Sequence, residues 1–174
     1  MRATPPAVLL ILSLGSGLGM GYGLGPGANS AAPGFASDAE RSDAATIEKF
    51  IASQESDENG QQAENYTKVV KGDLNHDGIP DAAVLYTLEG GNGTNGYVQY
   101  LAAFVRVNGR LVHAAHKPVG GRLYRAVEIK WIKDNLILLN TTGYGAQDPE
   151  CCPTLKGTTR YALVDNTLTE LPHR

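Results

Sequence analysis

From residue 66 onward, short apolar segments alternate with tight polar turns. Asn108-Gly109, Lys133-Asp134-Asn135 and Asp165-Asn166 each separate two such segments, and the Asn-Gly pair tolerates the positive φ that a primed hairpin turn requires. Strands are predicted at residues 82–88, 98–107, 110–116, 136–140, 158–164 and 167–171, and at the alternating Val127, Ile129 and Trp131. Successive strands joined by turns this short favour a mostly β (α+β) fold built on an antiparallel meander sheet.

One short N-terminal helix is expected before the strands. Its apolar face recurs at helical spacing and consists of Ala44, Ile47, Phe50 and Ile51. Ser42 or Asp43 is placed to cap its first turn. Residues 25–42 are rich in Gly, Ala, Pro and Ser and are interpreted as a tether, and the polar residues 53–64 as a loop.

The first 36 residues have the pattern of an export signal. Arg2 is their only charged residue, and the apolar stretch from Ala7 to Leu24 follows it. Such a stretch partitions into the membrane while the positive end stays inside. Alternate glycines weaken a spanning helix here, and an uncleaved membrane anchor is the alternative. The sequence therefore predicts a signal peptide or anchor with a tether at 1–36, one domain at 38–174, and a periplasmic or secreted location, with membrane contact only if the segment is uncleaved.

The charge balance argues against a nucleic-acid partner. Residues 37–174 contain 18 acidic side chains against 14 Lys and Arg, which is not the basic composition of a general nucleic-acid binder. The stretch from Arg106 to Lys133 nevertheless contains seven bases and one acid, Glu128. It indicates either a cationic face of the sheet or solvated strand edges, where Lys and Arg discourage pairing between sheets.

The segment Gly72–Asp81 carries oxygen-bearing side chains at a regular spacing. Counted from Asp73, positions 1, 3, 5 and 9 are Asp73, Asn75, Asp77 and Asp81, and position 6 is a glycine. A hard cation takes about six to eight oxygens, and alternate residues of a tightly curled loop point inward while the sixth turns sharply. The carbonyl of Ile79 would add another oxygen. Three carboxylates and an amide in this order predict a Ca²⁺ site.

The loop is not an EF-hand, because Val84 occupies the position of the bidentate glutamate. It resembles instead the calcium loops of FG-GAP and similar secreted β repeats, in which the aspartate at position 9 closes the coordination. The resemblance covers Gly72 to about Val84 and implies calcium, but not the bladed fold of those proteins. The alternative is an exposed turn in which Asp73, Asn75 and Asp77 only cap backbone amides.

The only two cysteines, Cys151 and Cys152, are adjacent within Asp-Pro-Glu-Cys-Cys-Pro. Two thiols of an exported protein are expected to be oxidised. Neighbouring Cα atoms lie about 3.8 Å apart across a trans peptide, below the usual disulfide range of about 4.4–6.8 Å, so a bond between them closes a strained ring. The sequence predicts a structural vicinal disulfide; free or intermolecularly bridged thiols and a redox or soft-metal site are the alternatives.

With the acidic loop, this segment resembles a set of small secreted bacterial proteins over residues 66–171, which implies export but no activity.

No catalytic set is predicted. The chain has no Gly-x-Ser-x-Gly elbow, and His113 and His116, three residues apart, would face opposite sides of a regular strand. The glycine-rich segment 90–96 lacks the lysine of a phosphate loop and is interpreted as a hairpin tip. Five tyrosines are interpreted as packing residues in preference to a sugar-binding surface: Tyr97, Tyr100, Tyr124, Tyr144 and Tyr161.

We therefore expect a non-enzymatic calcium-binding domain whose partner is an extracytoplasmic protein or a glycan; a periplasmic inhibitor and a redox protein using the cysteines are alternatives.

Overall fold

Strands make up most of the structure, as the turn spacing predicts. The computed structural model describes residues 37–91 and 96–172, so the predicted signal segment at 1–36 lies outside the described residues. Within those ranges it contains helix α1 (Asp38–Asp57), the 3-10 turn η1 (Glu64–Tyr66) and nine strands. The strands are β1 (Gln61–Gln62), β2 (Lys68–Gly72), β3 (Asp81–Glu89), β4 (Tyr97–Val107), β5 (Arg110–Gly121), β6 (Arg125–Lys133), β7 (Leu136–Gly143), β8 (Leu155–Val164) and β9 (Thr167–Leu171).

The strands pair in the order β1-β3-β4-β5-β6-β7-β8-β9, and β2 also pairs with β3. All these pairings are antiparallel, and from β3 to β9 each strand pairs with the next in sequence, so the predicted meander is confirmed. The predicted turns are present, with positive φ at both Asn108 (50°) and Gly109 (80°). The turns at Asp134-Asn135 and Asp165-Asn166 have the same sign of φ at both residues.

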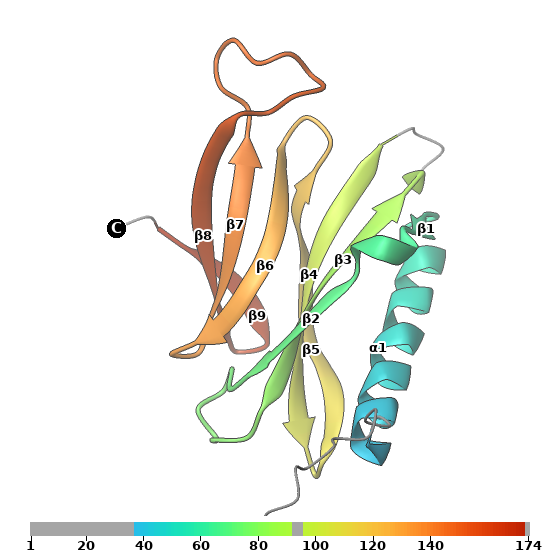
Figure 1. Cartoon of the computed structure of the whole chain (residues 1–174). Helices are drawn as coiled ribbons and strands as arrows, with labels where there is room; N and C mark the ends of the chain where they lie inside the picture. The colour runs from blue at the N-terminus through green and yellow to red at the C-terminus, as the bar shows by residue number, and fades with distance from the viewer. Residues whose placement is uncertain (1–36, 92–95, 173–174) are drawn as a thin grey trace, which may run out of the picture. The chain divides into compact units, whose positions relative to one another are not determined.

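Two hydrophobic cores cover the two faces of β3, β4 and β5. The first core lies between these strands and β6–β9, where residues such as Leu101 and Leu139 are fully buried. The second lies between the opposite face and α1, and includes Ile51, Tyr86 and Phe104. Figure 1 shows α1 on one side of β3–β5 and the β6–β9 layer on the other. Because β3 and β4 are covered on both faces, their sequences are apolar without alternation.

Helix α1 begins earlier than the sequence pattern predicts. Ser37 is its N-cap and forms a reciprocal capping box with Glu40, so the proposed cap at Ser42 or Asp43 is wrong, as is the tether prediction for residues 38–42. The first helical turn is exposed and shows no apolar periodicity, which is why the pattern missed it. Ala44 is also exposed, and the buried face of the helix includes the carboxylate of Asp43. The predicted loop at 53–64 contains the last turn of α1 and β1.

A side-chain amide bridges the place where the sheet bends between β5 and β6. Only Gly121 and Arg125 pair these two strands directly among the described residues. Further along, Gln99 of β4 accepts from the Val127 N–H at 2.8 Å and donates to the Val127 carbonyl at 3.1 Å. Gly120 leaves room for this bridge, because a Cβ there would lie 2.8 Å from the Gln99 Oε1. The Gln99 amide thus replaces a backbone partner for β6.

A charged network joins β6, β8 and β9. The guanidinium of Arg125 donates to both carboxylate oxygens of Glu170 at 3.1 Å and to the Tyr161 hydroxyl at 2.9 Å. Glu170 also accepts from Tyr161 at 2.6 Å and from Thr159 at 2.7 Å. Burial alone would raise the pKa of Glu170, but the hydrogen bonds from Arg125, Tyr161 and Thr159 outweigh burial and lower this pKa to about 2.

This network predicts a stability loss in acid. The depressed pKa of Glu170 stabilises the fold above the unfolded value of 4.5, and the contribution disappears as the pH falls from 4.5 to about 2. Because the Glu170 side chain is 37% exposed, we expect Glu170→Gln to cost only about 1–2 kcal/mol at pH 7. Urea unfolding at pH 7, 4.5 and 2.5 should show the wild type and Glu170→Gln converging toward acid. A constant gap, or an equal effect of Glu150→Gln at the exposed Glu150, would contradict this assignment.

Candidate functional site

The acidic loop, residues 73–80, connects β2 to β3 and is anchored to the sheet at its base. Leu74 is buried in the first core, which holds the start of the loop against the strands. The side chain of Asn135, from the β6–β7 turn, donates to the Asp73 carbonyl at 3.1 Å. These contacts hold the loop from below and leave its outer residues, from Asn75 to Pro80, exposed.

Asp81 is fully buried at the first position of β3. One of its carboxylate oxygens accepts from the Leu74 N–H at 2.9 Å, and the other accepts from the Arg106 N–H at 2.7 Å. Its side chain therefore closes the base of the loop and ties it to β4. The predicted position-9 ligand is thus directed at two backbone amides.

Arg106 connects the acidic loop to α1, although the sequence patterns did not single it out. Its Nε donates to the Pro80 carbonyl at 3.0 Å, and one Nη donates to the Gly109 carbonyl at 3.1 Å. The two Nη atoms also bind the carboxylate of Asp43 at 3.0 and 2.6 Å. The hydrogen bonds with Asp43 raise the pKa of Arg106 despite its burial. The loop, the β4–β5 turn and the helix are held by one guanidinium.

Asp73, Asn75 and Asp77 turn their oxygens toward the backbone of the loop. Asp73 accepts from the N–H groups of Asn75 (3.1 Å), His76 (2.7 Å) and Gly78 (3.0 Å). Asn75 accepts from the Asp77 N–H at 3.1 Å and donates to the Asp77 carboxylate at 2.9 Å. Partial desolvation opposes ionisation of Asp73, but the three amide hydrogen bonds lower its pKa. The three side chains therefore form one hydrogen-bonded cluster.

The curl of the loop requires special backbone geometry at its sixth position. Gly78 has φ of 78°, in the left-handed region, and His76 has φ of 66°. The sharp turn predicted for the glycine is thus present. The side chain of His76 is exposed, outside the cluster of oxygens.

The predicted calcium ligands are only partly gathered. Asp73, Asn75 and Asp77 are linked, Ile79 follows them at the surface with its N–H on Asp77, and Asp81 faces the base of the loop. No group of three or more His, Cys, Asp or Glu side chains within the described ranges is close enough to hold a metal ion. The donors that lie together are two carboxylates and an amide, which are hard oxygen ligands suited to Ca²⁺.

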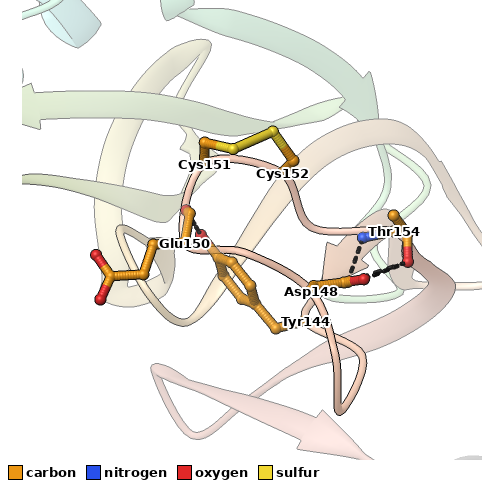
Figure 2. Close-up of a disulfide and its surroundings, with 6 residues drawn as sticks. All are labelled: Tyr144, Asp148, Glu150, Cys151, Cys152 and Thr154. Atoms are coloured by element: carbon orange, nitrogen blue, oxygen red, sulfur yellow. Dashed lines mark hydrogen bonds between the residues drawn. A yellow bond between two sulfur atoms is a disulfide. The ribbon is translucent and has the colours of Figure 1, made fainter.

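The predicted vicinal disulfide is present. Cys151 and Cys152 are bonded, with Cα atoms 3.8 Å apart, and both are exposed in the loop of residues 144–154 between β7 and β8. Figure 2 shows how the loop around the disulfide is held together. The Asp148 carboxylate accepts from the N–H groups of Gly145 and Thr154, both at 2.7 Å, and these bonds lower the pKa of Asp148. The acidic loop and this loop lie at opposite ends of the strands (Figure 1).

The two histidines of β5 lie on the same face, which corrects the prediction from their spacing. The pairing of β4 with β5 shifts register between Ala103 and Phe104, opposite Ala115 and His113. This irregularity adds a residue to β5, so His113 and His116 turn the same way, with ring centroids 5.2 Å apart. Phe50 of α1 stacks on His113 at 4.2 Å. Partial desolvation and the neighbouring His116 lower the pKa of His113, although both histidine side chains are exposed overall.

The basic stretch from Arg106 to Lys133 does not act as one cationic face. Arg106 is paired with Asp43 and Arg125 with Glu170. Lys117 donates to the Leu168 carbonyl and lies over the ring of Tyr161. The bases of this stretch are therefore distributed over several interactions and both layers of the fold.

The five tyrosines are likewise dispersed. Tyr100 and Tyr161 are buried in different cores. Tyr124 is exposed beside Arg125, and the Tyr144 hydroxyl donates to the Glu150 carbonyl at 2.8 Å. Tyr97 lines a surface hollow together with Tyr66, which the sequence analysis did not single out. Burial, with a smaller effect of Tyr144, raises the pKa of Tyr97.

Comparisons with protein-family models, with curated proteins and with solved structures found no match to the chain. In the part of the chain that the structure describes, no helix combines the length and the hydrophobicity needed to cross a membrane. The interpretation of the site therefore depends on its own geometry.

Proposed function

We propose that this chain is an exported, non-enzymatic β domain that binds Ca²⁺ through its acidic loop and binds a partner outside the cytoplasm. The clustering of Asp73, Asn75 and Asp77 on a curled, anchored loop supports this proposal more than any other observation. The three side chains cap five backbone N–H groups of the loop, and their placement at alternate positions also matches the demand of a hard cation.

In this proposal the ion binds the outer side of the loop. Asp73 and Asp77 supply charge, rotation of the Asn75 amide presents its oxygen, the Ile79 carbonyl adds another donor, and water completes the shell. We assign Asp81 mainly to bracing, because both of its oxygens accept backbone N–H groups. The loop is anchored before the ion arrives, so binding orders few additional residues and adds directly to stability.

Thermal melting of the chain with Ca²⁺ and with chelator tests the metal. At about 100 times its dissociation constant, one bound ion adds about 2.7 kcal/mol, which for a domain of this size raises the melting temperature by about 5–10 °C. We expect this shift for the wild type and most of it to vanish in Asp77→Asn, which removes a charge but keeps an oxygen for the Ile79 N–H.

The matched control is Asp165→Asn, at an exposed aspartate in the β8–β9 turn with φ of 47°. Asparagine tolerates that backbone geometry, so the control should keep the full calcium shift. Mg²⁺ at the same ionic strength should give a smaller shift, because it requires a rigid octahedral site. An unchanged midpoint in the wild type, or an equal shift in Asp77→Asn, would remove calcium from the proposed function.

A further inference from the structure

The strand pairing places His113 and His116 together on the face of β5 against which α1 packs. His113 pairs with Phe104 and His116 pairs with Ala102, and both partners belong to the second core. Paired residues of neighbouring strands point to the same face of a sheet, so both imidazoles lie on the α1 side. A regular strand would have separated them, because residues three apart face opposite sides. The pair exists because the β4–β5 pairing is irregular between these two positions.

Aromatic contacts restrain the two imidazole rings. Phe50 of α1 stacks on His113, with centroids 4.2 Å apart, and its centroid lies 5.4 Å from that of His116. Both histidines are nevertheless exposed, and both line a hollow of about 290 Å³ beside the β8–β9 turn. An ion in solution can therefore reach both rings. Because the rings are already restrained by packing, little side-chain freedom is lost when an ion binds them.

The separation of the rings matches that of two imidazoles bound to one metal ion. The centroids of His113 and His116 lie 5.2 Å apart, and their planes are inclined by 45°. A metal–nitrogen bond of about 2.0–2.1 Å places the centre of an imidazole about 3.2 Å from the ion. Two such rings at the tetrahedral angle have centres about 5 Å apart. In the described part of the chain neither imidazole has an ion pair, so no carboxylate competes for the ring nitrogens.

Two imidazoles favour a divalent transition metal over Ca²⁺. Imidazole suits Cu²⁺, Ni²⁺ and Zn²⁺, of which Cu²⁺ binds most tightly, whereas Ca²⁺ takes oxygen ligands. Desolvation and the neighbouring His116 lower the pKa of His113, which favours the neutral ring that binds metal. Both cysteines are joined in the disulfide, so they offer no thiolate to such an ion. No third His, Cys, Asp or Glu joins the pair among the residues described, so water fills the other positions of an open site.

We propose that His113 and His116 form a two-point chelating site for a divalent transition metal, with Cu²⁺ bound more tightly than Zn²⁺ or Ni²⁺. The site goes beyond the proposed function, because it uses nitrogen donors on β5 and shares no residue with the acidic loop. It depends neither on calcium nor on a partner. A failure of the acidic loop to bind Ca²⁺ would therefore leave this site standing, and the reverse also holds.

The test is a titration of the purified, untagged chain with Cu²⁺ in a non-coordinating buffer that contains millimolar Ca²⁺ to occupy the acidic loop. Isothermal titration should give one tightly bound ion per chain. The electron paramagnetic resonance spectrum of that ion should show splitting from two imidazole nitrogens. Zn²⁺ should bind the same chain more weakly. The inference is overturned if Cu²⁺ does not bind, or if its spectrum shows fewer than two nitrogen ligands.

Single variants locate the ion. His113→Asn and His116→Asn should each weaken Cu²⁺ binding at least about tenfold, because the remaining imidazole no longer chelates. The matched control is His76→Asn, at an exposed histidine whose φ of 66° asparagine tolerates, and it should keep the wild-type affinity. An equal loss in His76→Asn would place the ion at the acidic loop and overturn the assignment. His116→Asn leaves the stack of Phe50 on His113 in place, so it carries the test if His113→Asn does not fold.

A relocated histidine tests the geometry while the number of histidines stays constant. Val112 is 47% exposed and, as the neighbour of His113 in the strand, lies on the opposite face. The double variant Val112→His/His113→Asn should therefore bind Cu²⁺ as weakly as His113→Asn alone. Wild-type affinity in the double variant would show that any two nearby histidines suffice, which overturns the assignment to the paired rings. Melting curves recorded without metal verify that each variant is folded.

Discussion

Asp43→Ala is expected to lower the free energy of unfolding by about 3–5 kcal/mol, because it leaves a buried guanidinium without its counter-charge. The side chains of Asp43 and Arg106 are only 9% and 15% exposed, and two hydrogen bonds join them. Without the carboxylate, Arg106 keeps only the carbonyls of Pro80 and Gly109 as side-chain partners among the contacts described. Urea unfolding followed by circular dichroism measures the loss.

The same helix provides the control. Asp38 forms an ion pair with Arg41 at a side chain that is 98% exposed, so Asp38→Ala should cost less than about 1 kcal/mol. A double-mutant cycle of Asp43→Ala with Arg106→Met then isolates the pair, and we expect a coupling free energy of at least about 2 kcal/mol. If Asp43→Ala and Asp38→Ala destabilise equally, the ion pair does not hold α1 on the sheet.

Gln99→Met is expected to cost about 2–5 kcal/mol. Methionine matches the length of glutamine but leaves the Val127 N–H and carbonyl without the partner they have in Gln99, at about 1–3 kcal/mol for each buried group. Hydrogen exchange provides a local readout, because the Val127 amide hydrogen should exchange faster than the amide hydrogens of neighbouring strands.

Gln61→Met in the edge strand β1 is the matched control, since Gln61 is exposed and the same chemical change there should stay within about 0.5 kcal/mol. Exchange at Val127 should be unaltered in that variant. A Gln99→Met protein that unfolds at the same urea concentration as Gln61→Met would show that the bend between β5 and β6 is held by packing alone.

The turns explain why the sheet could be predicted from sequence and the helix start could not. Asn108-Gly109 and the two related turns carry their backbone geometry in their own chemistry, so the strands on either side were placed to within a few residues. The start of α1 depends on Ser37 and Glu40, a capping signal without an apolar stripe behind it. The apolar stripe instead favoured Ser42 or Asp43 as the cap, although the Asp43 carboxylate is buried against Arg106.

The candidate site also has features that could be predicted from the sequence and features that could not. The curl at Gly78 and the hydrogen bonds that Asp73, Asn75 and Asp77 make within the loop are local properties of ten consecutive residues. The direction of Asp81 is not local, because its partners include the N–H of Arg106, 25 residues away. His113 and His116 share a face because of an irregularity in strand pairing, and no residue type in β5 indicates that irregularity.

By itself, the sequence determined the antiparallel meander, its tight turns, the vicinal disulfide and the order of oxygen-bearing residues in the acidic loop. These features depend on residues close together in the chain, whose backbone preferences act before any long-range contact forms. Only the tertiary structure decided that Gln99 bridges β4 to Val127 of β6, that Arg106 joins the loop to α1, and that a surface hollow lies over β6, β7 and β8. Those features bring together residues far apart in sequence, and their geometry is set by which faces must be buried, a condition that the whole fold satisfies at once.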